Sequence, residues 1–183
     1  MRKALGLVFA TSLLIPVGIT AATPAGAVTG PTCKAFSATE TTSPGLPIVG
    51  SATKINAKVK LTGKLTGCSG GGVTGATVAQ AYTYNGNCTT FVTGKGGKTT
   101  PAVPTSTFTW SNHKTSTATS TVTLLTKPGV TPVKLKLATK ITQGLFAGAS
   151  NTGTVILTAP AGSCTKIPGS KATLTSSGSF AFK

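Results

Sequence analysis

Apolar and polar residues alternate with a period of two over long stretches of this chain. In the clearest stretch, Lys54 to Leu65, the odd positions are apolar or glycine and the even positions are lysine, asparagine or threonine. The segment from Val133 to Ile141 repeats the pattern, again with lysines at polar positions. Because successive side chains of a strand point to opposite faces, both segments predict half-buried β-strands.

Shorter stretches with the same alternation fill much of the remaining chain. They are centred on residues 36–38, 76–84, 108–110, 122–124, 155–157 and 172–182. Turn signals lie between them, among them Pro44-Gly45, Asn85-Gly86, which favours a hairpin turn, Asn112-His113-Lys114 and Pro128-Gly129. Residues 94–104 are predicted to form a long loop. About eight short strands of this kind are typical of a sandwich or a barrel, and we expect one antiparallel, all-β sandwich, Ig-like or similar, over residues 28–183.

The first 27 residues predict a signal peptide helix. Arg2 and Lys3 precede an apolar run from Ala4 to Ile19, and Ala25-Gly26-Ala27 matches the pattern cut by signal peptidase. The apolar run is shorter than the ~20 residues that a transmembrane helix needs, and no second run follows. We therefore expect cleavage after Ala27 and a secreted or cell-envelope-associated domain without a transmembrane segment.

Four cysteines remain after this cleavage: Cys33, Cys68, Cys88 and Cys164. An even number in an exported domain predicts two disulfides, for which three pairings are possible. We favour Cys33–Cys68 and Cys88–Cys164, because the segments that begin at Cys88 and Cys164 are similar. The cysteines lack the close spacing of a zinc site and His113 is the single histidine, so we expect no metal and no cofactor.

The charge balance is strongly one-sided. Without Arg2 and Lys3 the domain has fifteen lysines, no arginine and one acid, Glu40, which gives a net charge of +14. Such a chain attracts polyanions, and the same charge also favours solubility.

If the two clearest strands lie in one sheet, seven lysines share its solvent face. They are Lys54, Lys58, Lys60, Lys64, Lys134, Lys136 and Lys140. This face predicts unspecific binding to anionic cell-envelope polymer, DNA or anionic lipid, although lysines on exposed strands also discourage aggregation. Sequence-specific nucleic-acid recognition is not expected, because the domain lacks the arginines that read bases and its aromatic residues alternate like core residues.

The composition argues against an enzyme. Most glycosidases need two carboxylates, whereas this chain has Glu40 alone. A serine triad needs a histidine held by an acid, but His113 lies in a predicted turn without a G-x-S-x-G element nearby. The Gly96-Gly97-Lys98-Thr99 segment has Val92 where a phosphate-binding loop needs glycine. We therefore expect no catalytic residues.

Five short motifs are spread over most of the domain. They are Leu65-Thr66-Gly67-Cys68, Asn85-Gly86-Asn87-Cys88, Phe108-Thr109-Trp110, Gly144-Leu145-Phe146-Ala147-Gly148 and Ala159-Pro160-Ala161-Gly162-Ser163-Cys164. In these motifs the chain resembles a group of small secreted actinobacterial proteins of uncharacterised function, mycobacterial ones included. The resemblance implies an extracellular, disulfide-bonded β-fold and no activity. The chain differs from the group in its many lysines and in Ser163, where the group usually has an acid.

These observations lead to one functional expectation and two alternatives. We expect a secreted or envelope-associated, non-enzymatic domain that its lysine face holds on anionic polymer. One alternative is a structural or adhesive surface protein that binds other proteins through loops such as 94–104. The other is a pore-like barrel in an outer membrane, suggested by alternating strands that end in Phe180-Ala181-Phe182.

Overall fold

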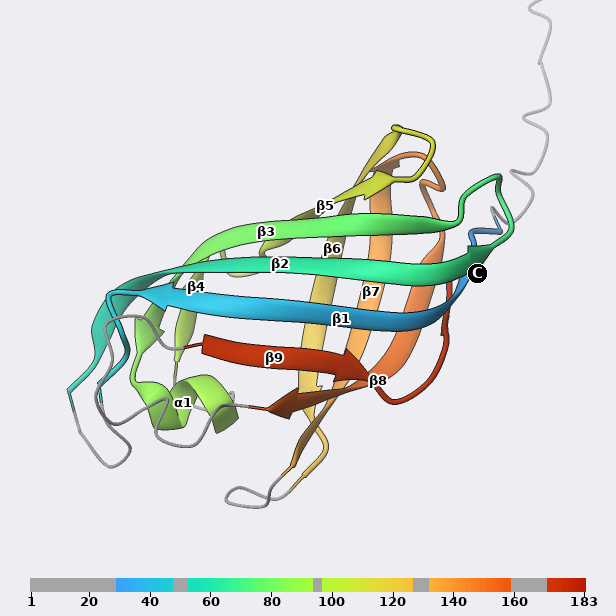
Figure 1. Ribbon diagram of the computed structural model, residues 1–183. Coiled ribbons are helices and arrows are strands. Elements are labelled where there is room, and N and C mark those ends of the chain that lie inside the picture. The colour runs from blue at the N-terminus through green and yellow to red at the C-terminus, as the bar shows by residue number, and fades with distance from the viewer. Residues whose placement is uncertain (1–28, 48–52, 94–96, 127–131, 159–170) are drawn as a thin grey trace, which may run out of the picture.

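The computed structural model describes residues 29–47, 53–93, 97–126, 132–158 and 171–183. Within these residues, ten strands form a single antiparallel sheet (Figure 1). Eight of them form the barrel: β1 (Thr32–Ser43), β2 (Ile55–Ser69), β3 (Gly75–Gly86), β5 (Thr105–Trp110), β6 (Thr115–Leu124), β7 (Val133–Gly144), β8 (Ser150–Thr158) and β9 (Lys171–Ser176). The other elements are the short strands β4 (Lys98–Thr100) and β10 (Phe180–Ala181) and the helix α1 (Cys88–Thr93).

The sheet closes on itself, so the predicted sandwich is wrong. Each barrel strand pairs with the next one along the chain, and β9 then pairs with β1, with Leu174 opposite Ala38. In Figure 1, β1, β2 and β3 run across the front of the barrel and cross β6 and β7 behind them at a steep angle. Period-two alternation predicts strands equally well for a sandwich and for a barrel, and it does not encode the pairing of the last strand with the first.

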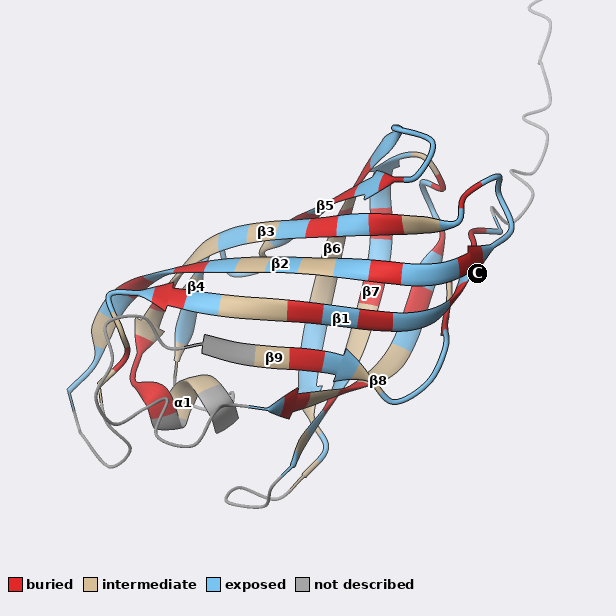
Figure 2. Ribbon diagram, viewed as in Figure 1, coloured by how far each residue is buried: buried red, intermediate tan, exposed pale blue. Residues whose placement is uncertain are grey.

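The alternation itself is confirmed on the long strands. On β2, Ala57, Val59 and Leu65 are buried, while Lys58, Lys60 and Lys64 between them are exposed (Figure 2). Two extra strands, β4 and β10, extend the sheet beside β3 and β1. The segment predicted as one final strand is therefore divided into β9 and β10, and β4 lies inside the predicted loop 94–104.

The hairpin turn predicted at Asn85-Gly86 is wrong, because these residues end β3 and a helix follows them. Asn87 caps this helix. Its Oδ1 accepts a hydrogen bond from the Thr90 backbone N–H at 2.9 Å, and the Thr90 hydroxyl oxygen accepts one from the Asn87 N–H, also at 2.9 Å. This reciprocal pair is an N-cap arrangement and favours a helix start over a tight turn.

One end of the barrel is sealed by aromatic side chains. Trp110, 1% exposed, packs edge-on against Phe146 at a ring-centroid distance of 5.0 Å and against Phe182 at 6.1 Å. Its indole N–H donates to the Ser116 hydroxyl at 2.7 Å, which in turn donates to the Leu145 carbonyl. The C-terminal residues hold this seal in place through backbone hydrogen bonds between Phe182 and Gly30 and between Phe182 and Pro31.

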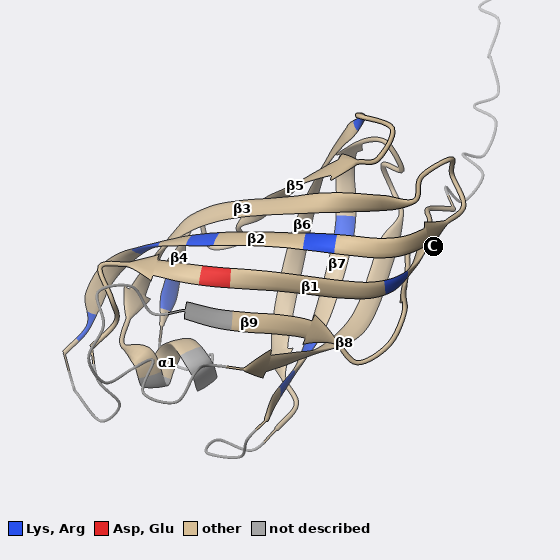
Figure 3. Ribbon diagram, viewed as in Figure 1, with Lys and Arg blue, Asp and Glu red and all other residues tan. Residues whose placement is uncertain are grey.

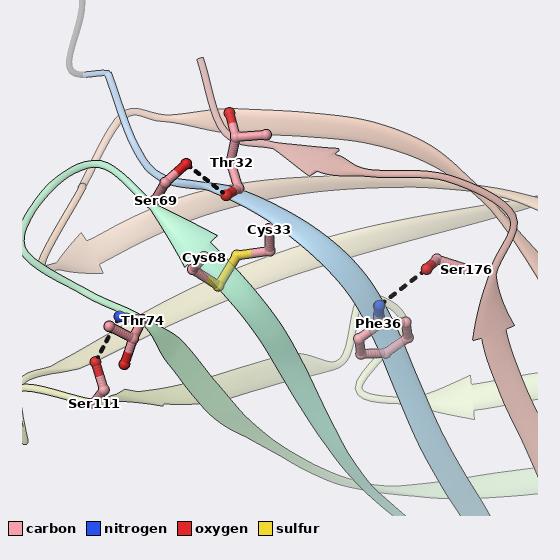
Figure 4. Close-up of a disulfide and its surroundings, with 8 residues drawn as sticks. All are labelled: Thr32, Cys33, Phe36, Cys68, Ser69, Thr74, Ser111 and Ser176. Carbon is pink, nitrogen blue, oxygen red and sulfur yellow. Dashed lines mark hydrogen bonds between the residues drawn. A yellow bond between two sulfur atoms is a disulfide. The ribbon is translucent and has the colours of Figure 1, made fainter.

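The Cys33–Cys68 disulfide is confirmed and joins β1 to β2 close to the sealed end (Figure 4). The two cysteines are direct cross-strand partners. Cys88 is also disulfide-bonded. Its predicted partner, Cys164, lies outside the described residues, as do the signal peptide and Pro128-Gly129, so these remain predictions.

Removing the Cys33–Cys68 bridge should destabilise the barrel without changing its fold. The bridge spans 35 residues of chain and constrains the unfolded state. We expect the double variant Cys33→Ala/Cys68→Ala to lose about 2–4 kcal/mol of unfolding free energy, measured by urea denaturation under oxidising conditions. A variant with an unchanged urea midpoint would contradict this expectation.

Candidate functional site

A cavity of about 760 Å³ lies inside the barrel. It reaches from Phe108, Phe180 and Phe182 at the aromatic seal to Tyr84 and Phe91 at the α1 end. The cavity follows from the alternation, because the inward positions of the barrel strands form its wall. Its apolar lining includes Phe36, Leu61, Leu65, Val78, Leu135, Leu137, Leu157 and Leu174.

The single acid of the chain, Glu40, lies in the wall of this cavity. The Tyr82 hydroxyl donates a hydrogen bond to its Oε1 at 2.5 Å. Burial raises the pKa of the Glu40 carboxyl, and the hydrogen bond from Tyr82 opposes this shift in part. Burial, and then the negative charge of Glu40, raise the pKa of Tyr82, so the phenol keeps its proton and acts as the donor.

Two more polar side chains line the cavity on β3 and β5. In the strand register, Glu40 is opposite Leu61, Leu61 is opposite Gln80, and Gln80 is opposite Ser106. Both Gln80 and Ser106 line the cavity, and neither side chain has a hydrogen-bond partner within the described residues. Directly opposed side chains on neighbouring strands are about 5 Å apart, so Gln80 and Ser106 are neighbours, whereas Leu61 lies between Gln80 and Glu40 in the same row.

A different wall of the cavity carries polar groups that satisfy each other. Ser120 on β6 and Thr139 on β7 share a hydrogen bond of 2.9 Å between their hydroxyls. Apart from the exposed Thr121 and Thr123 on β6, the free hydrogen-bonding capacity of the described lining side chains therefore lies on β1, β3 and β5.

The cavity opens sideways between β6 and the loop that precedes β5. Pairing of β5 with β6 ends at Thr105 and Thr119, although β6 continues to Leu124. Residues 102–104 and 121–123 line the cavity from the two sides of this gap. Val103 and Val122 are 49% and 60% exposed, which gives the mouth an apolar rim.

All seven candidate polyanion-binding lysines face solvent, but they do not share one face. Lys54, Lys58, Lys60 and Lys64 lie on or just before β2, and Lys134, Lys136 and Lys140 lie on β7 (Figure 3). In the closed barrel, three strands separate β2 from β7 in either direction. The assumption of one flat surface is therefore wrong, because it depended on an open sheet. Lysine binding to polyanions stays a prediction.

The remaining candidate residues lie away from the cavity. His113 is exposed in the turn between β5 and β6, with a positive φ of 63°, and is not among the cavity-lining residues. In the described part of the chain, no group of three or more histidine, cysteine or acidic side chains could hold a metal ion. No helix among the described residues is long and apolar enough to cross a membrane.

Sequence reasoning did not find the cavity, although one signal was present. Glu40 follows Phe36 and Ala38 at steps of two, which places the acid on the inward face of its strand. Gln80 likewise falls between Val78 and Tyr82 in an inward series. Polar residues at inward positions are the pattern expected of a polar site inside a barrel.

Comparison of the chain with protein-family models, with curated proteins and with solved structures finds no match. The resemblance to small secreted actinobacterial proteins therefore stays a prediction from the sequence.

Replacing Glu40 by glutamine should remove a component of pH-dependent stability. As pH rises through the ordinary glutamate value of about 4.3, the unfolded chain releases its proton before the folded one. The free energy of unfolding of the parent should then fall, by at most about 1.4 kcal/mol per pH unit, until the pH passes the raised folded-state pKa of Glu40.

The measurement is urea denaturation of the parent and Glu40→Gln between pH 4 and pH 8. Every titratable group other than residue 40 is the same in both proteins, so its contribution cancels in the difference. We expect the variant to become the more stable of the two towards pH 8. A difference that is constant with pH, or that changes in the opposite direction, would refute this reading of Glu40.

Proposed function

We propose that this domain is a binding protein that holds one small, largely apolar molecule inside its barrel. The observation that carries the proposal is the cavity of about 760 Å³, with an apolar lining and a few polar groups gathered on one wall. Ligand pockets typically measure about 300–1,000 Å³ and have this composition. Eight-stranded barrels are either filled by their own side chains or wide enough for one small ligand.

The inward side chains of the strands leave the middle of the barrel unfilled. Unfilled apolar volume costs stability, and larger side chains at inward positions would remove that cost. Instead, the seal at the Trp110 end is tightly packed, while the middle of the barrel stays open beside Glu40 and Gln80. An unfilled centre with an apolar mouth supports a binding role, with no catalytic step assigned to it.

The predicted signal peptide and the Cys33–Cys68 disulfide support a place of action outside the cytoplasm. The orientation of the side chains does not favour the pore-like alternative. Apolar residues face inward and lysines face outward, whereas a membrane barrel presents its apolar residues to lipid. The alternative of loop-mediated protein binding rests partly on residues 94–96, which lie outside the described residues.

Binding of a neutral apolar fluorescent probe tests the cavity. N-phenyl-1-naphthylamine should bind the purified domain with a blue shift and with one-to-one stoichiometry. Leu61 on β2 and Leu137 on β7 approach the cavity from opposite walls. The variant Leu61→Trp/Leu137→Trp narrows the cavity from both sides and should weaken probe binding by about tenfold or more, which corresponds to about 1.4 kcal/mol.

The matched control, Thr62→Trp/Lys136→Trp, adds the same two indoles at the neighbouring outward positions. It should bind the probe as the parent does. Equal binding by both double variants, or no binding by the parent, would refute the proposal.

Electrostatic attachment to anionic envelope polymer is retained as a second proposal, because the lysines of the described strands are unequally distributed. Lys34, Lys54, Lys58, Lys60, Lys64 and Lys98 are exposed on or beside β1, β2 and β4. On the opposite side, β7 carries only Lys134, Lys136 and Lys140 among the described residues. The β2 lysines stand opposite serine, threonine or alanine on both neighbouring strands, so their charges do not face each other across the sheet.

Two triple variants with equal net charge separate a docking face from bulk charge. Lys58→Gln/Lys60→Gln/Lys64→Gln should lose most binding to isolated envelope and to duplex DNA, with a salt slope that falls by up to about 3. Lys134→Gln/Lys136→Gln/Lys140→Gln should retain most of the binding. Equal losses would indicate net charge alone, and salt-independent binding would exclude an electrostatic attachment.

A further inference from the structure

Glu40 has no counter-ion among the described residues. Within the described residues no lysine forms an ion pair with it, and the lysines of β2 and β7 point away from the cavity. Tyr82 donates to Oε1 and leaves Oε2 without a described partner. A carboxylate in apolar surroundings is costly unless it is paired, which is why burial raises the pKa of Glu40. A cation bound beside Glu40 would stabilise its charged form.

The neighbours of Glu40 add acceptors of the same kind. The Gln80 carboxamide contributes a carbonyl oxygen and the Ser106 hydroxyl contributes a second oxygen, and both line the cavity without a partner among the described residues. Together with Glu40 they provide three acceptors along one row of the sheet. A primary ammonium group has three N–H donors, no acceptor and a positive charge, so it can pair with Glu40 and suits a wall of acceptors.

Other polar ends match the row less well. A hydroxyl group can donate only one hydrogen bond and brings no charge to pair with Glu40. A carboxylate cannot donate at all and would be repelled by ionised Glu40. The apolar wall formed by Leu135, Leu137 and Leu157 suits a hydrocarbon body in each case, so the polar row decides the class of ligand.

We propose that the cavity selects an amphiphilic primary amine, whose ammonium group binds Glu40 and whose apolar body fills the barrel. The inference rests on the proposed function and names its ligand class. Charge-assisted hydrogen bonds are roughly twice as strong as neutral ones, and the ammonium would supply a counter-ion for Glu40.

The test compares three ligands that differ only in the polar end. Dodecylamine, dodecanol and dodecanoic acid are titrated, below their aggregation concentrations, against N-phenyl-1-naphthylamine bound to the parent domain at pH 7. We expect dodecylamine to displace the probe at about a tenfold lower concentration than dodecanol, with dodecanoic acid weakest. The comparison is repeated at high salt, which screens attraction of dodecanoate to the surface lysines.

Glu40→Gln keeps the size of the side chain and removes its charge. We expect this variant to bind dodecylamine no more tightly than dodecanol. The matched control, Thr41→Gln, introduces the same amide at the neighbouring outward position, and it should keep the preference of the parent. Circular dichroism and the urea midpoint establish that both variants are folded.

The outcomes separate the two proposals. If the parent prefers dodecanol or dodecanoic acid, or if Glu40→Gln keeps the amine preference, the amine inference is wrong while ligand binding in the barrel stands. If neither the probe nor any of the three ligands binds the parent, the proposed function itself fails.

Discussion

The pairing of β9 with β1 is the contact on which the rest of the structure depends. It turns a meandering sheet into a closed barrel and leaves no open edge along Ser37 to Thr41 of β1. Closure also creates an inside, so the apolar positions of all eight strands face one another across a shared space. Without it, Glu40 would lie on an open sheet face with water on that side. Because it lies in a wall, its carboxyl is buried and its pKa is raised.

One end of the barrel is tightly packed, whereas its middle is unfilled. At one end Trp110, Phe146 and Phe182 pack together, and the Cys33–Cys68 bridge and the C-terminal backbone hold the first and last segments over them. This seal supplies the packed core that a closed sheet needs for stability. The middle is then free to remain unfilled. At the gap beyond Thr119, β6 has no β5 partner, and the exposed side chains of Val103 and Val122 mark a way in.

The sequence predicted the strands better than their assembly. Alternation located β2 and β7 because each has one buried and one exposed face, and that period survives in any β architecture. Which strand the last strand pairs with depends on contacts between distant parts of the chain. No local pattern encodes that pairing, so the alternation fitted a sandwich and a barrel equally well. The error then spread to the lysines, since two strands assumed to share a face are opposite each other in a ring.

Asn87 and Thr90 carried a helix-capping signal, but Asn85-Gly86 beside them suggested a hairpin. Glu40 was visible as a polar residue at an inward position, yet without closure there was no inside for it to line.

The described positive and negative side chains lie on opposite sides of the barrel wall in this domain. The described lysines of the strands lie outside, and the single acid lies in the cavity wall. An outer field of this sign opposes the approach of a cationic ligand. However, the lysines are exposed to solvent, and at physiological ionic strength their field is screened over about 8 Å. When Glu40 is ionised, its charge acts inside the barrel, where it is screened much less, so its attraction for a bound cation exceeds that distant repulsion. The two proposed roles are also geometrically compatible. If the β2 side rested on a polymer, β3 and β5 would separate that contact from β6, and the mouth between β6 and residues 102–104 would remain accessible.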